Sequence, residues 1–403
     1  MTDIAKRPLL SIVVPTRNRA ETALSCVAAL LKIEGDDFEV VVRDCSDTDA
    51  LEREIAVFAD HRLRYERGSA VSMTDNWNAA MLMTSGRYVI YIGDDDAFMP
   101  WGLSALRGLA DKEVVHCIAS EPTRIVYRWP DFGIEADRGL LVFERFQYPP
   151  VFYRQSSLEA LRAHLTCQDF APPLPGIYHR IASRDLMERI KSKTGAYFSS
   201  LSPDYFTYYL SANLLDEYHV MDPPISMSGS CGKSNSSRNT AKSDRALVQL
   251  HIKEYGEVAT AGQRFGETCG IDGLNADLIR GALEVGGDTE MLQLFDDRYA
   301  ARMCATVACK TPLRTPHIFK AYQSHALANA TFVRRIKGTL NFGIGMLAFT
   351  IRHVDYKLRL LGWRESAFNK RLYRFERIPD IDKAIGIVEK TTIEVALGRQ
   401  ISA

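Results

Sequence analysis

Short apolar runs alternate with amphipathic segments along the first hundred residues. The runs are four or five residues long and rich in β-branched side chains, whereas the segments between them repeat apolar positions every three or four residues. This alternation predicts βαβ units, and therefore an α/β fold with a mostly parallel sheet flanked by helices. The predicted strands are 10–14, 38–42, 62–65 and 88–92, and the predicted helices are 20–31, 50–58 and 73–83.

Polar residues directly follow three of the predicted strands. In an open parallel sheet, ligands bind beyond the carboxyl ends of the strands. Side chains at these positions should therefore gather at one edge, and we expect the chemistry of the chain there. They are Thr16, Arg17 and Asn18 after the first strand, Asp44 after the second, and Asp94, Asp95 and Asp96 after the fourth.

The pattern changes twice further along the chain. Residues 111–235 mix strand-like pieces with prolines and many aromatic residues, which predicts an α+β region. From about Lys242 onwards the apolar spacing is mostly helical, which predicts a mainly helical C-terminal region. We therefore divide the chain into 1–110, 111–235 and 236–403.

Composition narrows the class of protein. The 50 basic and 50 acidic side chains cancel, so a globally basic nucleic-acid-binding protein is not indicated and we expect no nucleic-acid partner. The eight cysteines form no CxxC pair, which is typical of a reducing compartment. The first apolar run is broken by Pro15, too early for a signal peptide. These features predict a cytoplasmic protein.

Three consecutive aspartates stand out in the sequence YIGDDDAFMP. A solvated turn would tolerate them, and the local sequence leaves that interpretation open. In a partly closed site, two unit charges about 4 Å apart repel by about 4 kcal/mol at an effective dielectric of 20, so a cation would be needed. Mg²⁺ and Mn²⁺ prefer oxygen ligands. The alternative interpretation is therefore a divalent-cation site.

Several segments, in order and spacing, resemble the signatures of family 2 glycosyltransferases of the GT-A fold. They are SIVVPTRNRA, FEVVVRDCSDTD and NWNAAMLMTSGRYVIYIGDDDAFMPWGL. The resemblance covers about residues 8–110 and continues more loosely to about 235. It implies a GT-A (Rossmann-like) domain in which 1–110 bind the nucleotide sugar and 111–235 bind the acceptor. It also implies an inverting sugar transfer that uses Mn²⁺ or Mg²⁺.

The resemblance implies roles for residues near the base of the donor. Pro15, Thr16 and Arg17 would line the base pocket, and Asp44 would bind the edge of a uracil. Asn18 would belong to the same donor-binding set. Arg17 stands where the family frequently has a tyrosine that stacks on the base, and a guanidinium can stack on a π-face as well.

The resemblance also implies roles for the acidic cluster. Asp94 would bind the ribose and Asp95 would be the principal metal ligand. Asp96 would be an additional metal ligand or lie behind the ligands. Asn78 would contribute to the binding of the nucleotide sugar. The sequence departs from the family pattern after Asp44, where the family usually has Asp and Gly and this chain has Cys45 and Ser46, which weakens any prediction of the donor.

Asp204 is the candidate catalytic base. It follows Ser202 and Pro203, which are typical of a helix start, and family members have an acidic residue here. An inverting transfer needs a base for the acceptor hydroxyl. On the local sequence alone, an acidic first turn favoured by the helix dipole is the competing interpretation.

A segment rich in Gly, Ser and Asn, SGSCGKSNSSRN, spans residues 228–239. Its composition predicts a mobile loop. One hypothesis is that the loop closes over the donor and that Lys233 or Arg238 contacts the diphosphate. A solvated linker explains the composition equally well.

Residues 332–377 are basic and partly apolar. The apolar stretch GTLNFGIGMLAFTI is too short to span a membrane. Two interpretations remain open, a helix packed within the C-terminal region or an interfacial helix that makes a peripheral contact with anionic lipid.

Taken together, the sequence predicts a metal-dependent inverting glycosyltransferase. The donor would be a nucleotide-diphosphate sugar, with a UDP-sugar as first candidate, and the acceptor a glycan or lipid-linked hydroxyl in bacterial surface polysaccharide synthesis. The alternatives are a nucleotidyltransferase with a related sheet and a non-catalytic relative that binds a sugar or a partner.

Overall fold

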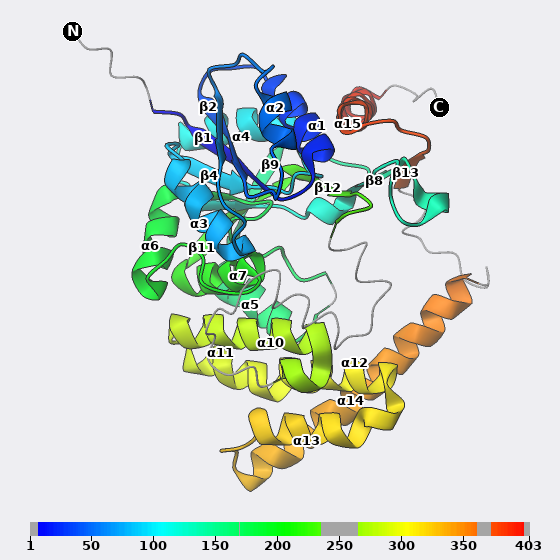
Figure 1. The fold of residues 1–403 in the computed structure, drawn as a ribbon. Coiled ribbons are helices and arrows are strands. Elements are labelled where there is room, and N and C mark those ends of the chain that lie inside the picture. The colour runs from blue at the N-terminus through cyan, green and yellow to red at the C-terminus, as the bar shows by residue number, and fades with distance from the viewer. Residues whose placement is uncertain (1–6, 169, 235–264, 361–371, 399–403) are drawn as a thin grey trace.

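The computed structural model describes residues 7–168, 170–234, 265–360 and 372–398 (Figure 1). A mixed sheet with helices on both faces occupies the upper part of Figure 1, and a group of helices lies below it. The predicted α/β fold with a mainly helical C-terminal region is therefore confirmed.

The main sheet is mostly parallel, as predicted. Among the described residues it has eight strands in the order β3-β2-β1-β4-β10-β6-β11-β9. Only β10 and β9 run against their neighbours. The strands are β1 (Leu10–Thr16), β2 (Phe38–Asp44), β3 (Leu63–Arg67), β4 (Tyr88–Tyr91), β6 (Cys117–Ala119), β9 (Val151–Ser156), β10 (Ile181–Ser183) and β11 (Glu217–Asp222).

The two faces of the main sheet carry separate cores. Successive side chains of a strand point to opposite faces, so Val13 joins one core while Ile12 and Val14 join the other. Within the sheet domain, the helices that contribute to the core of Val13 are α3 (Met73–Met83), α5 (Ser157–Leu165), α6 (Arg184–Thr194) and α7 (Pro203–Leu214), and the helical region described below contributes to the same core. Those contributing to the other core are α1 (Ala20–Leu31), α2 (Ala50–Ile55), α4 (Pro100–Ala110) and α15 (Ile381–Ala396).

A second sheet adjoins the acidic cluster, with the order β13-β8-β7-β12-β5. Its strands are β5 (Ala97–Phe98), β7 (Ile125–Arg128), β8 (Leu140–Glu144), β12 (Ser226–Ser230) and β13 (Leu372–Phe375). The prediction of a mobile loop at 228–239 is wrong at its start, because 228–230 pair in parallel with 126–128 of β7. Residues 235–239 lie outside the described residues.

The helical region begins beside the sheet domain. Among the described residues its first helix is α10, which packs against α7, and α14 packs along α12. The helices are α10 (Gly266–Gly286), α11 (Thr289–Leu294), α12 (Ala300–Lys310), α13 (Thr315–His325) and α14 (Phe332–Leu360).

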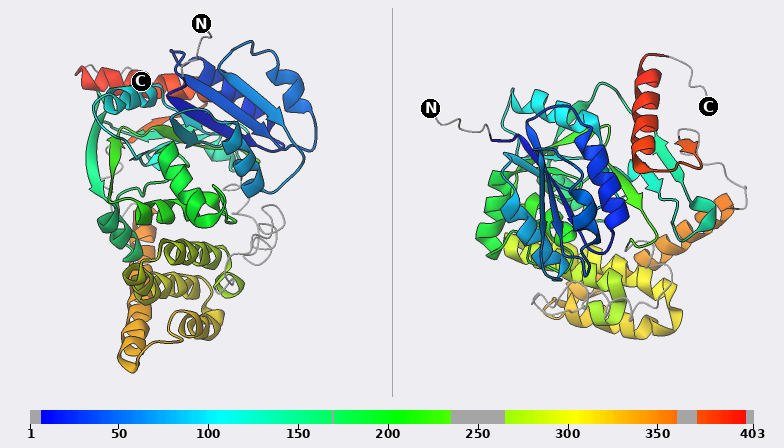
Figure 2. Two further views of the ribbon diagram at one scale, coloured as in Figure 1. Left: turned by 90° about the vertical axis from the view of Figure 1, so that its left-hand side faces the viewer. Right: turned by 45° about the horizontal axis from the view of Figure 1, so that its top comes forward.

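The end of the chain returns to the sheet domain. β13 pairs with β8, and α15 lies beside α1 (Figure 2). Lys32, directly after α1, and Asp382 of α15 form an ion pair of 2.8 Å, and Ile381 is fully buried in the core of the sheet. The predicted region 236–403 therefore needs correction, since 372–397 pack with the sheet domain. Apolar spacing predicts a helix but does not indicate against which part of the protein the helix packs.

Candidate functional site

The carboxyl ends of β1, β2 and β4 meet at one edge, as predicted. Pro15 and Thr16 end β1, and Thr16 Oγ1 donates a hydrogen bond to Oδ2 of Asp94. The amide of Cys45, next to Asp44, donates to the carbonyl of Thr16 at 3.1 Å. The predicted carboxylates at this edge are all buried, each with 5% or less of its surface exposed. A solvated turn is therefore excluded.

A guanidinium that the sequence analysis did not single out lies beside two of the aspartates. Arg19 Nη1 is 3.0 Å from Oδ1 of Asp94 and 3.5 Å from Oδ1 of Asp95. Burial lowers the pKa of Arg19, but the two carboxylates outweigh burial and raise this pKa well above its ordinary value. Arg19 therefore stays charged and offsets part of the repulsion within the cluster.

Asp94 and Asp95 remain short of positive charge even with Arg19 beside them. Burial raises the pKa of Asp94 to about 7, with Arg19 opposing the rise and Asp95 adding to it. Burial and Asp96 raise the pKa of Asp95. Oδ1 of Asp94 accepts no hydrogen bond. A cation or a hydrogen-bond donor brought by a ligand would stabilise the ionised forms.

Asp96 is satisfied from within the protein. Its Oδ2 accepts from the Gly93 amide at 2.7 Å and the Tyr178 hydroxyl at 2.9 Å, and it lies 3.2 Å from His179 Nε2. Its Oδ1 accepts from the Gly229 amide at 2.8 Å. Burial would raise the pKa of Asp96, but His179 and these bonds lower it. The geometry therefore speaks against Asp96 as a metal ligand and assigns it to holding the turn.

Strand β12 brings its backbone onto the acidic cluster. Besides the Gly229 amide on Asp96, the amide of Cys231 donates to Oδ2 of Asp95 at 3.3 Å. A Cβ atom on Gly229 would stand 1.6 Å from the carbonyl oxygen of Asp95, so a glycine is required at this close approach. This contact joins segments far apart in the chain, so local sequence patterns could not predict it.

Asp44 is fixed by two hydrogen bonds. Its Oδ1 accepts from the Ser46 amide at 2.8 Å and its Oδ2 from the Tyr65 hydroxyl at 3.0 Å. Burial and Asp44 raise the pKa of Tyr65, so the hydroxyl stays protonated as a donor. The predicted contact of Asp44 with a base stays a prediction.

The loop after β1 borders a hollow. Asn18 donates to Oδ2 of Asp47 at 2.7 Å and accepts from the Asp47 amide at 2.9 Å, while Arg17 lies 3.3 Å from Oδ1 of the same aspartate. Asn18, Ser46 and Lys233 all line a hollow of about 770 Å³. The structure thus brings Lys233 to the predicted edge. Arg238 lies outside the described residues.

Asn78 forms hydrogen bonds to the protein backbone. Its amide group donates to the Phe198 carbonyl at 2.7 Å and the Thr74 carbonyl at 3.0 Å, and its Oδ1 accepts from the Phe198 amide at 3.2 Å. These bonds attach the segment before α7 to α3. The geometry therefore speaks against Asn78 as a donor-binding residue.

Asp204 stands in the first turn of α7. Pro203 and Asp204 begin the helix as predicted, although Ser202 provides no side-chain cap. Burial raises the pKa of Asp204, and His179 is among the groups that oppose the rise. Tyr178, which donates to Asp96, is within electrostatic reach of Asp204 as well. Asp204 therefore borders the group of residues that surrounds the acidic cluster.

One stretch of the chain matches a known protein family. Residues 11–162 match the model of glycosyl transferase family 2. This match covers less than half of the chain. The predicted resemblance is thereby confirmed for the part of the chain that carries the acidic cluster and Asp44.

Part of the chain is also similar to curated proteins of bacterial glycan synthesis. A putative colanic acid biosynthesis glycosyl transferase, WcaA of Escherichia coli (strain K12), is 30% identical over 112 residues, 27% of this chain and 40% of that protein. A GalNAc(5)-diNAcBac-PP-undecaprenol beta-1,3-glucosyltransferase of Campylobacter jejuni is 24% identical over 138 residues, 32% of this chain and 45% of that protein. Both matches span less than half of the relative's length.

Solved structures with a similar outline include S. aureus TarS 1-349 in complex with UDP-GlcNAc. The likeness covers 85% of this chain and 91% of that one, at 14% identity and a TM-score of 0.43. A mannosyltransferase from Pyrobaculum calidifontis in complex with GDP-Man and Mn²⁺ has a TM-score of 0.37 at 16% identity, covering 87% and 88%. TM-scores this low support no inference about this chain.

The acidic cluster at the end of β4 fits a divalent cation that is shared with a ligand. Mg²⁺ is commonly held by one or two carboxylates together with substrate phosphates. Asp95, with Asp94 beside it, offers such a set, because these are the cluster carboxylates whose pKa values are raised. Over the described ranges, no group of three or more His, Cys, Asp or Glu residues could hold a metal ion by itself. The fit therefore depends on a ligand that brings further oxygens.

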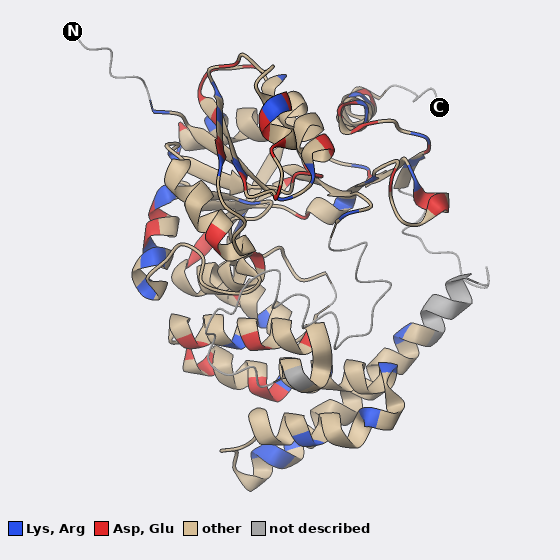
Figure 3. Cartoon of the chain, viewed as in Figure 1, with Lys and Arg blue, Asp and Glu red and all other residues tan. Residues whose placement is uncertain are grey.

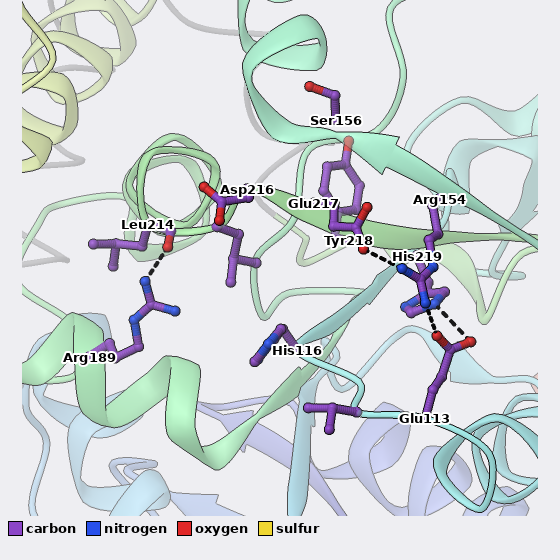
Figure 4. Close-up of a pocket in the computed structure, with 12 residues that line it drawn as sticks. Glu113, His116, Arg154, Ser156, Arg189, Leu214, Asp216, Glu217, Tyr218 and His219 are labelled. Atoms are coloured by element: carbon purple, nitrogen blue, oxygen red, sulfur yellow. Dashed lines mark hydrogen bonds and ion pairs between the residues drawn. The ribbon is translucent and has the colours of Figure 1, made fainter.

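A second hollow lies at the opposite edge of the main sheet, near the start of β6 (Figure 4). Its volume is about 620 Å³. The arginines in it are bonded within the protein, because Arg154 pairs with Glu113 and with Glu217, and Arg189 donates to the carbonyl of Leu214. Both arginines of this hollow are therefore already engaged by groups of the protein.

Proposed function

We propose that this chain transfers a sugar from a nucleotide-diphosphate sugar to a hydroxyl of a glycan or lipid-linked acceptor, with inversion at the anomeric carbon. A UDP-sugar is the first candidate donor. The observation that carries the proposal is the pair of buried carboxylates with raised pKa values, Asp94 and Asp95, at the ligand-binding edge of a family 2 domain.

The setting of the proposal is bacterial surface polysaccharide synthesis in the cytoplasm. Relatives named for colanic acid biosynthesis and for glucosyl transfer to an undecaprenol-linked glycan support the setting. The eight cysteines all lie within the described residues and form no disulfide bond there, which fits a reducing compartment.

The binding roles follow from position. Asp44 would accept a hydrogen bond from the base, and the guanidinium of Arg17 would stack on its face. Asp94 would accept from the ribose. Lys233, on the hollow beside Asn18, would pair with the diphosphate. Mn²⁺ or Mg²⁺ would be held by Asp95 and, when bound, supplies positive charge against the diphosphate.

The chemical role falls to Asp204. Its carboxylate would accept the proton of the acceptor hydroxyl as the acceptor oxygen forms a bond to the anomeric carbon. The bond from that carbon to the diphosphate oxygen breaks, and its electron pair leaves with the nucleotide. Attack from the face opposite the leaving group would convert an α-configured donor into a β-linkage. Burial suits the role, because the raised pKa makes Asp204 a stronger base.

Calorimetry with UDP tests the donor site. We expect wild-type protein to bind UDP more tightly with Mn²⁺ than without it, and Asp95→Asn to lose this difference. Asp36→Asn is the matched control, because that side chain is 84% exposed and far from the cluster in the sequence. A screen of UDP-sugars for UDP release would then identify the donor.

The proposal has clear ways to fail. Failure to bind UDP, GDP and dTDP, with or without metal, would overturn the donor site. Release of pyrophosphate from a nucleoside triphosphate would indicate a nucleotidyltransferase instead.

A further inference from the structure

Helix α14 carries apolar residues on two opposite faces. Its inner face packs along α12, where Phe342 and Gly345 are buried and a Cβ on Gly345 would stand 2.8 Å from Cβ of Ala305. Packing therefore accounts for one face, as one of the two sequence interpretations expected. It leaves the other face unexplained.

The outer face carries a continuous row of exposed large apolar side chains. They recur at intervals of three or four residues, which places them on one side of the helix. Leu340 and Leu347 are each 62% exposed, and the others are between 44% and 77% exposed. This outer stripe consists of Phe332, Ile336, Leu340, Ile344, Leu347 and Ile351.

The charge beside the outer stripe has one sign. Residues 332–353 contain three arginines and one lysine and no Asp or Glu. Figure 3 shows blue and no red along this part of the helix. Arg334 is paired with Asp297 of the neighbouring segment at 2.6 Å, whereas Arg335 and Lys337 are exposed beside the stripe.

We propose that the outer stripe of α14 lies flat in the surface of a membrane that contains anionic lipid. An interfacial helix buries an apolar face among the lipids while flanking cations meet the headgroups. Within the described ranges, no helix has the length and apolar character to cross a bilayer. The proposal does not depend on the proposed sugar transfer, because it rests on the helix surface alone.

The charge pattern favours lipid over a second copy of the chain. If two outer stripes met face to face, Arg335 and Lys337 of each copy would approach cations of the other. The described side chains of α14 provide no carboxylate to balance them. An anionic membrane supplies the missing charge over the whole length of the stripe.

Vesicle co-sedimentation of the full chain tests the proposal. We expect binding to vesicles of phosphatidylcholine and phosphatidylglycerol in equal parts, weaker binding to phosphatidylcholine alone, and loss of binding as salt screens the headgroups. Leu340→Asp with Leu347→Asp should weaken binding at least about tenfold, since the stripe loses two apolar anchors and gains charge. Lys337→Glu should weaken it about fivefold or more, because each basic residue near an anionic surface contributes about that factor.

Leu82→Asp is the matched control, an exposed leucine of α3 with 74% of its surface accessible. It should bind vesicles like the wild type. Equal vesicle binding by all variants would overturn the proposal. A second result would also overturn it: the wild type does not bind vesicles and is a dimer in light scattering, and the Leu340→Asp, Leu347→Asp variant is a monomer. That result would show that the outer stripe binds a second copy of the chain. Because all substituted side chains are exposed, unchanged circular dichroism is expected throughout.

Discussion

The chemistry of this site is decided by an imbalance of charge between single residues. Three aspartates stand in sequence, but they differ in their surroundings. Asp96 has enough donors for its pKa to be lowered, whereas Asp94 and Asp95 share one guanidinium and keep raised pKa values. Arg19 therefore balances only part of the negative charge of Asp94 and Asp95, and the remainder is available to a ligand. A cation brought with the donor would complete the balance, which is the physical basis for expecting metal-dependent UDP binding.

At the same scale, Asp204→Asn should separate chemistry from binding. An amide cannot take the acceptor proton, so turnover should fall by about 10²–10⁴-fold, the usual contribution of a general base. UDP affinity should change little, because the proposed binding residues are left intact. Initial rates and calorimetry on the same preparations measure the two effects.

The pH profile gives a second readout for Asp204. Burial raises its pKa, so the ionised base is present above this raised pKa and is lost as the pH falls through it. Wild-type kcat should therefore rise with pH through the Asp204 pKa, and the variant should lack that limb. Asp185→Asn is the control, an exposed aspartate in the first turn of α6. Parallel loss of turnover and UDP binding in Asp204→Asn would reject the role as base.

At the scale of elements, structure that depends on the local sequence pattern could be predicted, whereas structure that depends on long-range contacts could not. Apolar spacing predicted α1 and α3 with the bounds that the structure has. The buried face of a helix depends on residues three or four apart, so it can be recognised in a short stretch of sequence. The edge of the sheet was equally predictable, because parallel strands end together. β12 was not predictable, because its Gly/Ser-rich sequence is typical of a loop and becomes a strand through pairing with β7 and contact with the acidic cluster.

Arg19, Tyr178 and His179 were missed for a related reason. Each acts through a partner that only the folded chain brings near. Asn78 was assigned by resemblance, and its bonds to the backbone of Phe198 could not be read from sequence.

Gly229→Ala tests the contribution of β12. The added methyl group would meet the Asp95 carbonyl, so either the strand or the acidic turn must move. We expect a loss of about 1–3 kcal/mol in the free energy of unfolding, as for other overpacked sites. UDP affinity should also fall, because the amides on Asp95 and Asp96 shift. Chemical denaturation and calorimetry measure the two effects.

Gly108→Ala is the matched control for that prediction. This glycine lies in α4 and has open space around it, so alanine should stabilise the helix by about 0.5–1 kcal/mol. If Gly229→Ala were as stable as the wild type and bound UDP equally well, the close approach of β12 to Asp95 would contribute neither to stability nor to UDP binding.

At the scale of the whole molecule, the helical region packs against the sheet domain. α10 packs on α7, the helix that begins with Pro203 and Asp204, so the helical region supports the element that carries the proposed base. The chain then passes through α14 and returns to α1 through α15. A membrane contact at the outer stripe would therefore fix the position of the donor edge relative to the lipid surface, where a lipid-linked acceptor is found.

The return of the chain end makes α15 part of the core of the sheet domain. Ile381→Ala should lower the free energy of unfolding by about 2–5 kcal/mol, because this side chain is fully buried. Ile393→Ala, in the same helix but 37% exposed, should cost much less. Hydrogen exchange locates the effect: amides of α1 should exchange faster in Ile381→Ala, and amides of α12 should not. Faster exchange confined to α12 would instead place α15 with the helical region, and the boundary at residue 236 would then hold to the end of the chain.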